Sequence, residues 1–139
     1  MSTFNYKAGM SSVGQYQMSA IPYATASVTV VALGNDPVRI DFPRISKFVT
    51  IRNVISTDDA DATFRVGFSS IGTSGSVAGQ DNYFTLANGE SYTGEWRIKS
   101  IYLLSDSAVQ SSASIIAGLT TVSTGSLGFD NWSGSLGVG

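Results

Sequence analysis

The sequence predicts an all-β fold, namely an antiparallel β-sandwich of roughly seven or eight strands with an extended arm at each end. Short apolar segments that alternate or are β-branched recur about every 10–15 residues, separated by Gly, Asn, Asp and Pro. No window of about 11 residues shows the 3.6-residue apolar period of a helix. The chain has 139 residues, a length typical of one domain with a buried core.

The N-terminal segment, residues 1–23, is polar and carries spaced aromatic and methionine residues. It has neither a helical period nor sustained alternation, so we expect an extended arm. Residues 26–33 (ASVTVVAL) then form a nearly continuous apolar run typical of a buried strand. After the Gly-Asn-Asp-Pro turn, residues 38–42 (VRIDF) alternate and predict a second strand that ends before Pro43.

The middle of the chain predicts two more strands and two loops. Residues 46–53 (SKFVTIRN) form the third strand, and residues 56–62 (STDDADA) form a polar loop. Residues 63–69 alternate again, with Phe64, Val66 and Phe68 expected inward and Arg65 and Gly67 outward. The Ser- and Gly-rich stretch that follows predicts a long loop through residue 79.

The last part of the sandwich is predicted from residues 83–122. Residues 83–86 form a short strand, followed by a turn in which Asn-Gly suits a positive φ. Residues 91–104 form the longest strand-like stretch, but its alternation slips between Ile98 and Ile101, which indicates a bulge or a bend into two strands. Residues 112–122 supply the final strand. The sandwich is therefore assigned to residues 24–122.

The C-terminal segment, residues 123–139, is Gly- and Ser-rich and is compatible with a flexible end. It also carries Leu127, Phe129, Trp132 and Leu136, and large apolar side chains on a tether can fill pockets on a neighbouring subunit. We favour the second interpretation because the N-terminal arm repeats the pattern. The residues expected to contact other subunits or a capsid are Phe4, Tyr6, Tyr16, Phe129 and Trp132.

Charge and composition exclude several classes of function. Charged residues make up 13% of the chain, about half of the usual share, and the net charge is −2. The basic residues are scattered, so we expect no direct binding of nucleic acid. No apolar stretch of about 18 residues predicts a membrane span, and the first residues do not resemble a secretory signal.

The chain has no cysteine and no histidine. Disulfides, thiolate metal sites and the commonest general base are thereby excluded, so we expect no enzyme activity, no cofactor and no metal site. The acidic loop with Asp58, Asp59 and Asp61 does not match a calcium-binding spacing. Glu90 and Glu95 are the only glutamates, and nothing around them indicates a catalytic pair.

Aromatic residues gather in the second half of the predicted sandwich. They are either core residues and cross-strand pairs, which we favour, or the lining of a sugar-binding face. The residues concerned are Tyr83, Phe84, Tyr92, Trp96 and Tyr102.

Several segments together resemble small jelly-roll capsid proteins of double-stranded DNA viruses. That group includes cement or decoration proteins of tailed bacteriophages and minor capsid proteins of large viruses. The resemblance covers roughly residues 25–122. The segments that carry it are residues 38–53, 64–69, 82–92, 97–104 and 114–120.

The resemblance implies a jelly roll that is made in the host cytoplasm and assembled into the virion. There it would bind the major capsid protein as a homo-oligomer, a dimer or a trimer, and it would have no catalytic residues. Other interpretations stay open: a vertex or minor capsid protein, a carbohydrate- or receptor-binding module of a fibre or adhesin, and a hydrolase built on a sandwich. The small size of the sandwich favours an accessory role over that of a sole shell protein.

Overall fold

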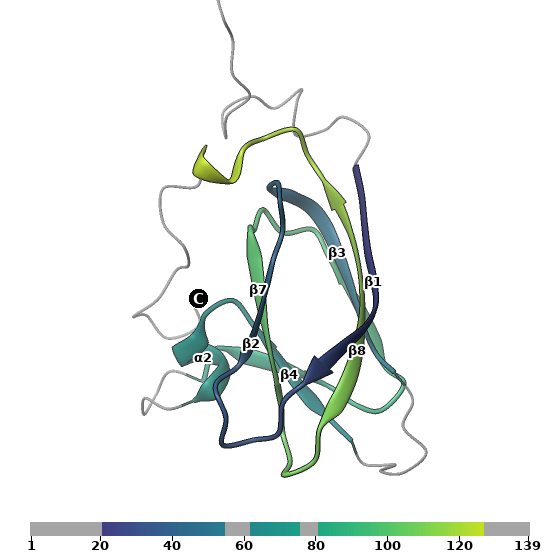
Figure 1. Cartoon of the computed structure of the whole chain (residues 1–139), viewed down its shortest axis with the longest axis vertical. Coiled ribbons are helices and arrows are strands. Elements are labelled where there is room, and N and C mark those ends of the chain that lie inside the picture. Colours follow the sequence, from purple (N-terminus) through teal and green to yellow (C-terminus); the bar gives the residue numbers. More distant parts are fainter. Residues whose placement is uncertain (1–20, 55–61, 76–80, 127–139) are drawn as a thin grey trace, which may run out of the picture.

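The computed structural model describes residues 21–54, 62–75 and 81–126, which form two facing β-sheets (Figure 1). This confirms the prediction of an all-β sandwich with eight strands. The strands are β1 Ile21–Val30, β2 Val38–Asp41, β3 Ser46–Asn53, β4 Phe64–Gly67, β5 Tyr83–Leu86, β6 Ser91–Gly94, β7 Ser100–Ser105 and β8 Ser111–Leu119. A short helix, α2 (Ser70–Ser74), follows β4, and a 3-10 turn, η1 (Thr124–Ser126), follows β8.

The eight strands pair in a nested order. One sheet has the order β1-β8-β3-β6 and the other the order β2-β7-β4-β5, with every pair antiparallel. The first strand pairs with the eighth, the second with the seventh, the third with the sixth and the fourth with the fifth. The chain therefore resembles one long antiparallel hairpin whose turn lies between β4 and β5. Successive strand pairs of this hairpin belong alternately to the two sheets.

The core lies between the sheets and follows from the alternation of the strands. In β3, Val49 and Ile51 are fully buried whereas Arg52 is exposed, as expected for a strand with one face on the core. Phe64 and Val66 of β4 are likewise buried, as predicted. All six residues of β7 are buried, because one face meets the core and the other lies where α2 packs.

The predicted loop after β4 contains the helix α2, so that prediction was wrong over residues 70–74. The Ser69 side chain accepts a hydrogen bond from the Gly72 N–H at 3.0 Å and caps the N-terminus. Gly75 adopts a φ of 65° and its N–H reaches the Ile71 carbonyl, which ends the helix. Five residues are too few to show a helical apolar period, so only these caps could have signalled the helix.

The helix also explains why Gly67 is buried although it was expected to face outward. Gly67 lies on the outer face of β4 as predicted, but Thr73 of α2 packs directly on it. A Cβ at Gly67 would overlap the Thr73 hydroxyl and would lie 3.2 Å from the Asn82 carbonyl oxygen. The close approach of α2 to the sheet thus requires glycine at this position.

The first strand begins earlier than the sequence predicts. β1 starts at Ile21, which pairs with Leu119, and it ends at Val30, so residues 21–23 of the expected arm belong to the sandwich. A register shift between Thr25 and Val28 interrupts the alternation and explains why the start was missed. The other predicted arm residues, 1–20 and 127–139, lie outside the described residues.

The predicted strands agree with the structure to different degrees. Residues 26–33 were expected to form a buried strand, but β1 ends at Val30, which is its only buried residue. The strand predicted over residues 63–69 spans only Phe64–Gly67, and the last strand ends at Leu119 and not at residue 122. β3 and β5 have the expected bounds, and the slip in residues 91–104 is a break into two strands, β6 and β7. Gly89 has a φ of 79°, as the Asn-Gly turn predicts.

Candidate functional site

An aromatic cluster closes the side of the sandwich where β5 and β6 are the edge strands. Tyr92 pairs with Ile51, and Gly94 pairs with Val49, so both positions face the space between the sheets. The indole of Trp96 lies against Gly94, where any Cβ would overlap it. We call the cluster of Phe68, Phe84, Tyr92 and Trp96 the aromatic edge.

Four of the six possible pairs among the rings of the aromatic edge are in contact. Tyr92 and Trp96 are stacked, with centroids 5.6 Å apart and an interplanar angle of 21°. Phe68 meets Trp96 edge-on at 4.9 Å, and Phe84 lies 5.2 Å from Tyr92 and 6.0 Å from Trp96. Such pairs add roughly 0.5–1.5 kcal/mol beyond the area they bury. The cluster therefore stabilises the contact between the two sheets at the edge formed by β5 and β6.

A buried serine holds the backbone of the aromatic edge in place. The Ser46 hydroxyl donates to the Trp96 carbonyl and accepts from the Ile98 N–H at 3.2 Å. The Ser46 N–H also donates to the Ile98 carbonyl at 2.9 Å. The segment after β6 is therefore fixed to the start of β3, which sets the position of the indole.

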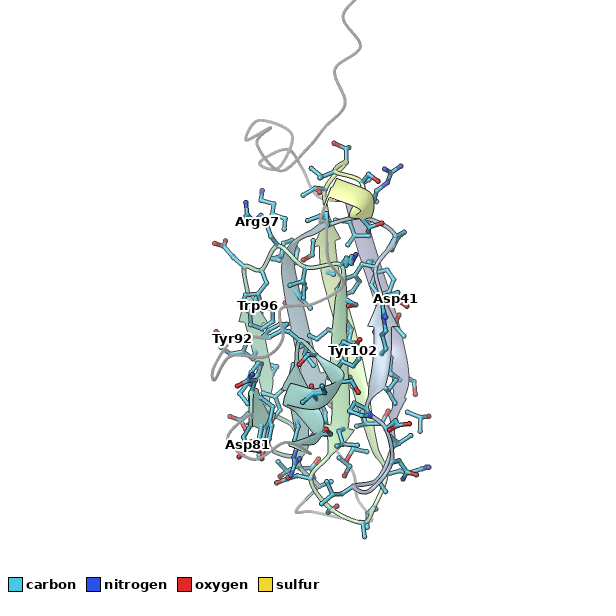
Figure 2. All side chains as sticks on the ribbon, turned by 90° about the vertical axis from the view of Figure 1, so that its left-hand side faces the viewer. Asp41, Asp81, Tyr92, Trp96, Arg97 and Tyr102 are labelled. Carbon is cyan, nitrogen blue, oxygen red and sulfur yellow. The ribbon has the colours of Figure 1, made fainter. Side chains whose placement is uncertain are left out.

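A cleft of about 270 Å³ lies beside Trp96, lined by Phe68, Glu95, Trp96, Arg97 and Ile98. Glu95 and Arg97 are exposed, whereas Trp96 is half-buried. Figure 2 shows Tyr92, Trp96 and Arg97 along the same edge of the molecule. The cleft offers an apolar wall, a carboxylate and a guanidinium, which suits binding by ring contacts and hydrogen bonds.

A second cleft of about 380 Å³ lies between α2 and the turn that joins β1 to β2. Leu33 and Ile71 contribute exposed apolar side chains to it. Its polar lining consists of Asn35, Asp36, Ser70 and Ser74.

The outer face of the β1-β8-β3-β6 sheet is a third candidate, and we call it the open face. Among the described elements, none packs over it, whereas α2 lies on the outer side of the other sheet (Figure 1). Ile116 is 51% exposed, the largest exposed fraction among the large apolar side chains described. The strand registers place twelve positions on the open face: Pro22, Ala24, Thr29, Phe48, Thr50, Arg52, Ser91, Thr93, Ser112, Ser114, Ile116 and Gly118.

The five aromatic residues considered as a sugar-binding face do not form one surface. Phe84, Tyr92 and Trp96 meet at the aromatic edge. Tyr83 lies under the Arg65 guanidinium, 4.4 Å from its Cζ, and Tyr102 is 7% exposed on the face where α2 packs.

The two glutamates considered as a catalytic pair lie at opposite ends of β6. Glu90 accepts a hydrogen bond from the Ala87 N–H at 2.8 Å and closes the turn before the strand, whereas Glu95 follows the strand. Four extended residues span about 13 Å, and paired glycosidase carboxyls lie about 5–9.5 Å apart. The arrangement does not favour a pair.

The remaining candidate residues fall outside the described part of the chain. They are the expected contact residues Phe4, Tyr6, Tyr16, Phe129 and Trp132, and the acidic loop residues Asp58, Asp59 and Asp61. Within residues 21–54, 62–75 and 81–126, no three Asp or Glu side chains gather as metal ligands. In the same residues, neither helix has the length and apolar character needed to cross a membrane.

The open face and the second cleft were not predicted from the sequence. The sequence holds one indication of the open face, namely two adjacent apolar residues, Ile115 and Ile116, of which only one can face the core. Local alternation does not tell which of the two that is. No known protein family and no curated protein matches this chain.

Proposed function

We propose that this protein is a capsid cement or decoration protein that binds the major capsid protein of a virus as a homo-oligomer. The nested strand pairing carries the proposal. Pairing of the first strand with the eighth, and so on inward, in two four-stranded sheets is what an eight-stranded jelly roll requires. Jelly rolls are frequent in viral capsid proteins, so the pairing supports this form of the sandwich and this role.

The surface supports a role in extended contacts. Only Arg52 is charged among the twelve positions of the open face. Burying such a surface removes few charges from water, so the desolvation penalty of an interface is small.

An oligomer can bind a shell firmly through modest individual interfaces. Once one subunit is bound, the others face their sites at high effective concentration, and avidity exceeds each single affinity by about 10²–10⁴. A decoration protein of this size would then resist capsid expansion by many small contacts. A vertex or minor capsid protein would use the same physics at fewer sites.

The proposal is tested by quantitative mass spectrometry of purified virus particles from the source of the sequence. We expect the protein at a fixed ratio to the major capsid protein. A low fixed copy number would favour a vertex or minor capsid role, and absence from particles would overturn the proposal. Adding the recombinant full chain to particles stripped of it should restore that ratio.

Carbohydrate binding is a second candidate, favoured by the cleft beside Trp96. Lectin domains also use the jelly roll, and the cleft combines an indole with the exposed Glu95 and Arg97. A glycan array of the full chain should then show binding that Arg97→Ala removes and Arg52→Ala, a change on the open face, does not. An array with no binding would exclude this candidate and leave the first untouched.

A further inference from the structure

We propose that the open face joins two copies of this chain around a two-fold axis that passes close to Ile116. The inference rests on the proposed function, since it names the interface of the homo-oligomer. It begins from the difference between the two sheets. The outer face of the β2-β7-β4-β5 sheet receives α2 (Figure 1), whereas the open face has no cover among the described elements.

The centre of the open face is apolar. In the sheet register, Ala24, Ile116, Thr50 and Thr93 form one row across β1, β8, β3 and β6. The next row contains Pro22, Gly118 and Phe48. These rows place the most exposed large apolar side chain described in the chain, Ile116, beside other apolar residues in mid-sheet.

Hydroxyl groups surround this apolar centre, and some already bond to each other. Thr50 Oγ1 and Thr93 Oγ1 lie 2.8 Å apart, and Ser27 Oγ and Ser112 Oγ lie 3.4 Å apart. Since hydroxyls both donate and accept, the hydroxyl groups of two such surfaces can bond to each other across an interface. This favours a second copy over a partner selected by charge.

Arg52, the one charged residue among the twelve positions that the register places on the open face, also permits self-association. Arg52 lies two residues along β3 from Thr50, in the row of Ser114. A two-fold axis through the Ile116 row places the two Arg52 residues on opposite sides, about four residues or 13 Å apart. At that distance the two guanidinium groups do not contact each other, and the exposed Arg52 side chain is long enough to keep its charged end in solvent beyond the apolar centre.

The area of the open face suits a modest dimer. Four strands span about 19 Å and seven residues of β8 about 23 Å, which gives roughly 450 Å² per copy and 900 Å² for the pair. A specific interface needs about 1,000 Å² in total, and accessible area exceeds such a flat projection. We therefore expect a dissociation constant in the micromolar range, adequate for a subunit that binds a shell at several points.

The first test uses the absence of cysteine from the chain. In the full chain, Ile116→Cys places a thiol near the axis, where a residue meets its own copy. Under mild oxidation we expect a disulfide-linked dimer on a non-reducing gel. The matched control is Val109→Cys, because Val109 is 49% exposed, close to the 51% of Ile116, but lies in the turn between β7 and β8.

The second test measures association directly by sedimentation of the full chain over a range of concentrations. We expect the wild-type protein to form a dimer, and Ile116→Asp to raise its dissociation constant at least about tenfold. Val109→Asp should leave that constant unchanged. Both variants should keep the wild-type circular dichroism spectrum because both side chains are exposed. Their melting temperatures should match that of the wild type at concentrations below its dissociation constant, where all three proteins are monomers.

The inference is overturned if the wild-type chain is a monomer or a trimer, if both cysteine variants cross-link at the same rate, or if Ile116→Asp dimerises normally. The outcomes separate it from the proposed function. A protein present in particles but monomeric in solution would overturn only the dimer. A dimer that depends on Ile116 but is absent from particles would overturn only the capsid role.

Discussion

At the residue scale, Arg65 joins helix α2 to the sheet beneath it. Its Nε donates to Asp106 Oδ1 at 2.7 Å, and its Nη1 donates to the carbonyls of Ser74 and Thr73 at 3.0 and 3.3 Å. Both carbonyls belong to the last turn of the helix, where carbonyl groups take their partners from outside the helix. The guanidinium also lies over the Tyr83 ring. The planar guanidinium makes all these contacts at once through several N–H donors, whereas the single ammonium group of a lysine cannot.

We predict that Arg65→Lys lowers the free energy of unfolding by about 1–2 kcal/mol. Urea denaturation of the full chain measures the change. Arg39→Lys is the matched control, because Arg39 pairs with Asp41 at 2.6 Å but its side chain is 41% exposed, against 12% for Arg65. An exposed pair contributes about 0–1 kcal/mol, so equal losses in the two variants would contradict the role assigned to Arg65.

A buried amide provides a second prediction at this scale. Asn53 is fully buried, and its Nδ2 donates to the carbonyls of Ala62 and Leu86, both at 2.9 Å. Asn53→Asp would set a carboxylate against two carbonyl oxygens, so we expect it to lower the unfolding free energy by about 3 kcal/mol or more.

The control for this change is another asparagine that donates to a carbonyl. Asn35 is exposed, and its Nδ2 reaches the Ala32 carbonyl at 3.0 Å. Asn35→Asp should change the unfolding free energy by less than about 1 kcal/mol because water solvates the new charge. Thermal unfolding of both variants provides the comparison, and a mild effect at Asn53 would show that the buried amide is not essential.

At the element scale, helix α2 depends on a contact that only glycine allows. Thr73 is fully buried, donates through its Oγ1 to the Ser69 carbonyl at 2.7 Å and packs on Gly67. The helix is too short to be stable alone, so its packing on β4 and β7 stabilises it.

We predict that Gly67→Ala lowers the unfolding free energy by about 1–3 kcal/mol, because the new methyl group overlaps Thr73. Gly125→Ala is the control, since its nearest neighbour would be Ser123 Oγ at 3.6 Å and the site is exposed. The double variant Gly67→Ala with Thr73→Ala should lose less stability than the two single changes added together. Strict additivity in a urea titration would show that the two residues do not clash.

At the scale of the whole molecule, the last strand of the described residues ends before the C-terminal segment. Val122 is fully buried, its N–H donates to Thr120 Oγ1 at 3.2 Å, and its carbonyl accepts from the Ile45 N–H at 3.1 Å. Ser123 and Gly125 beyond it are exposed.

We therefore predict that deleting residues 123–139 leaves the melting temperature nearly unchanged but weakens binding to capsids. Binding is measured by co-sedimentation with particles that lack the protein, and calorimetry measures the melting. A matched variant, Phe129→Ala with Trp132→Ala, should weaken binding in the full-length chain as well. Wild-type binding by the truncated protein would contradict a role for the C-terminal segment.

Local patterns were enough to find most strands. Alternation and turn residues predicted the bounds of β3 and β5, the break between β6 and β7, and the burial of Phe64 and Val66, because these features depend on residues close together in the chain. The sequence indicated Phe84, Tyr92 and Trp96 only as members of a larger group of five aromatic residues, and it did not indicate that these three contact one another.

Tertiary structure alone decided the rest. The caps Ser69 and Gly75 are the only local signal of helix α2, and the packing of Thr73 on Gly67 of β4, which stabilises it, is not visible in a five-residue pattern. In the pair Ile115 and Ile116, both residues are apolar, and pairing of β8 with β1 and β3 turns the first inward and the second outward. The sequence by itself determined the all-β fold class, through its short alternating segments, and the absence of cysteine and histidine chemistry. Long-range strand pairing, which is absent from local patterns, determined which face of that chain is left open.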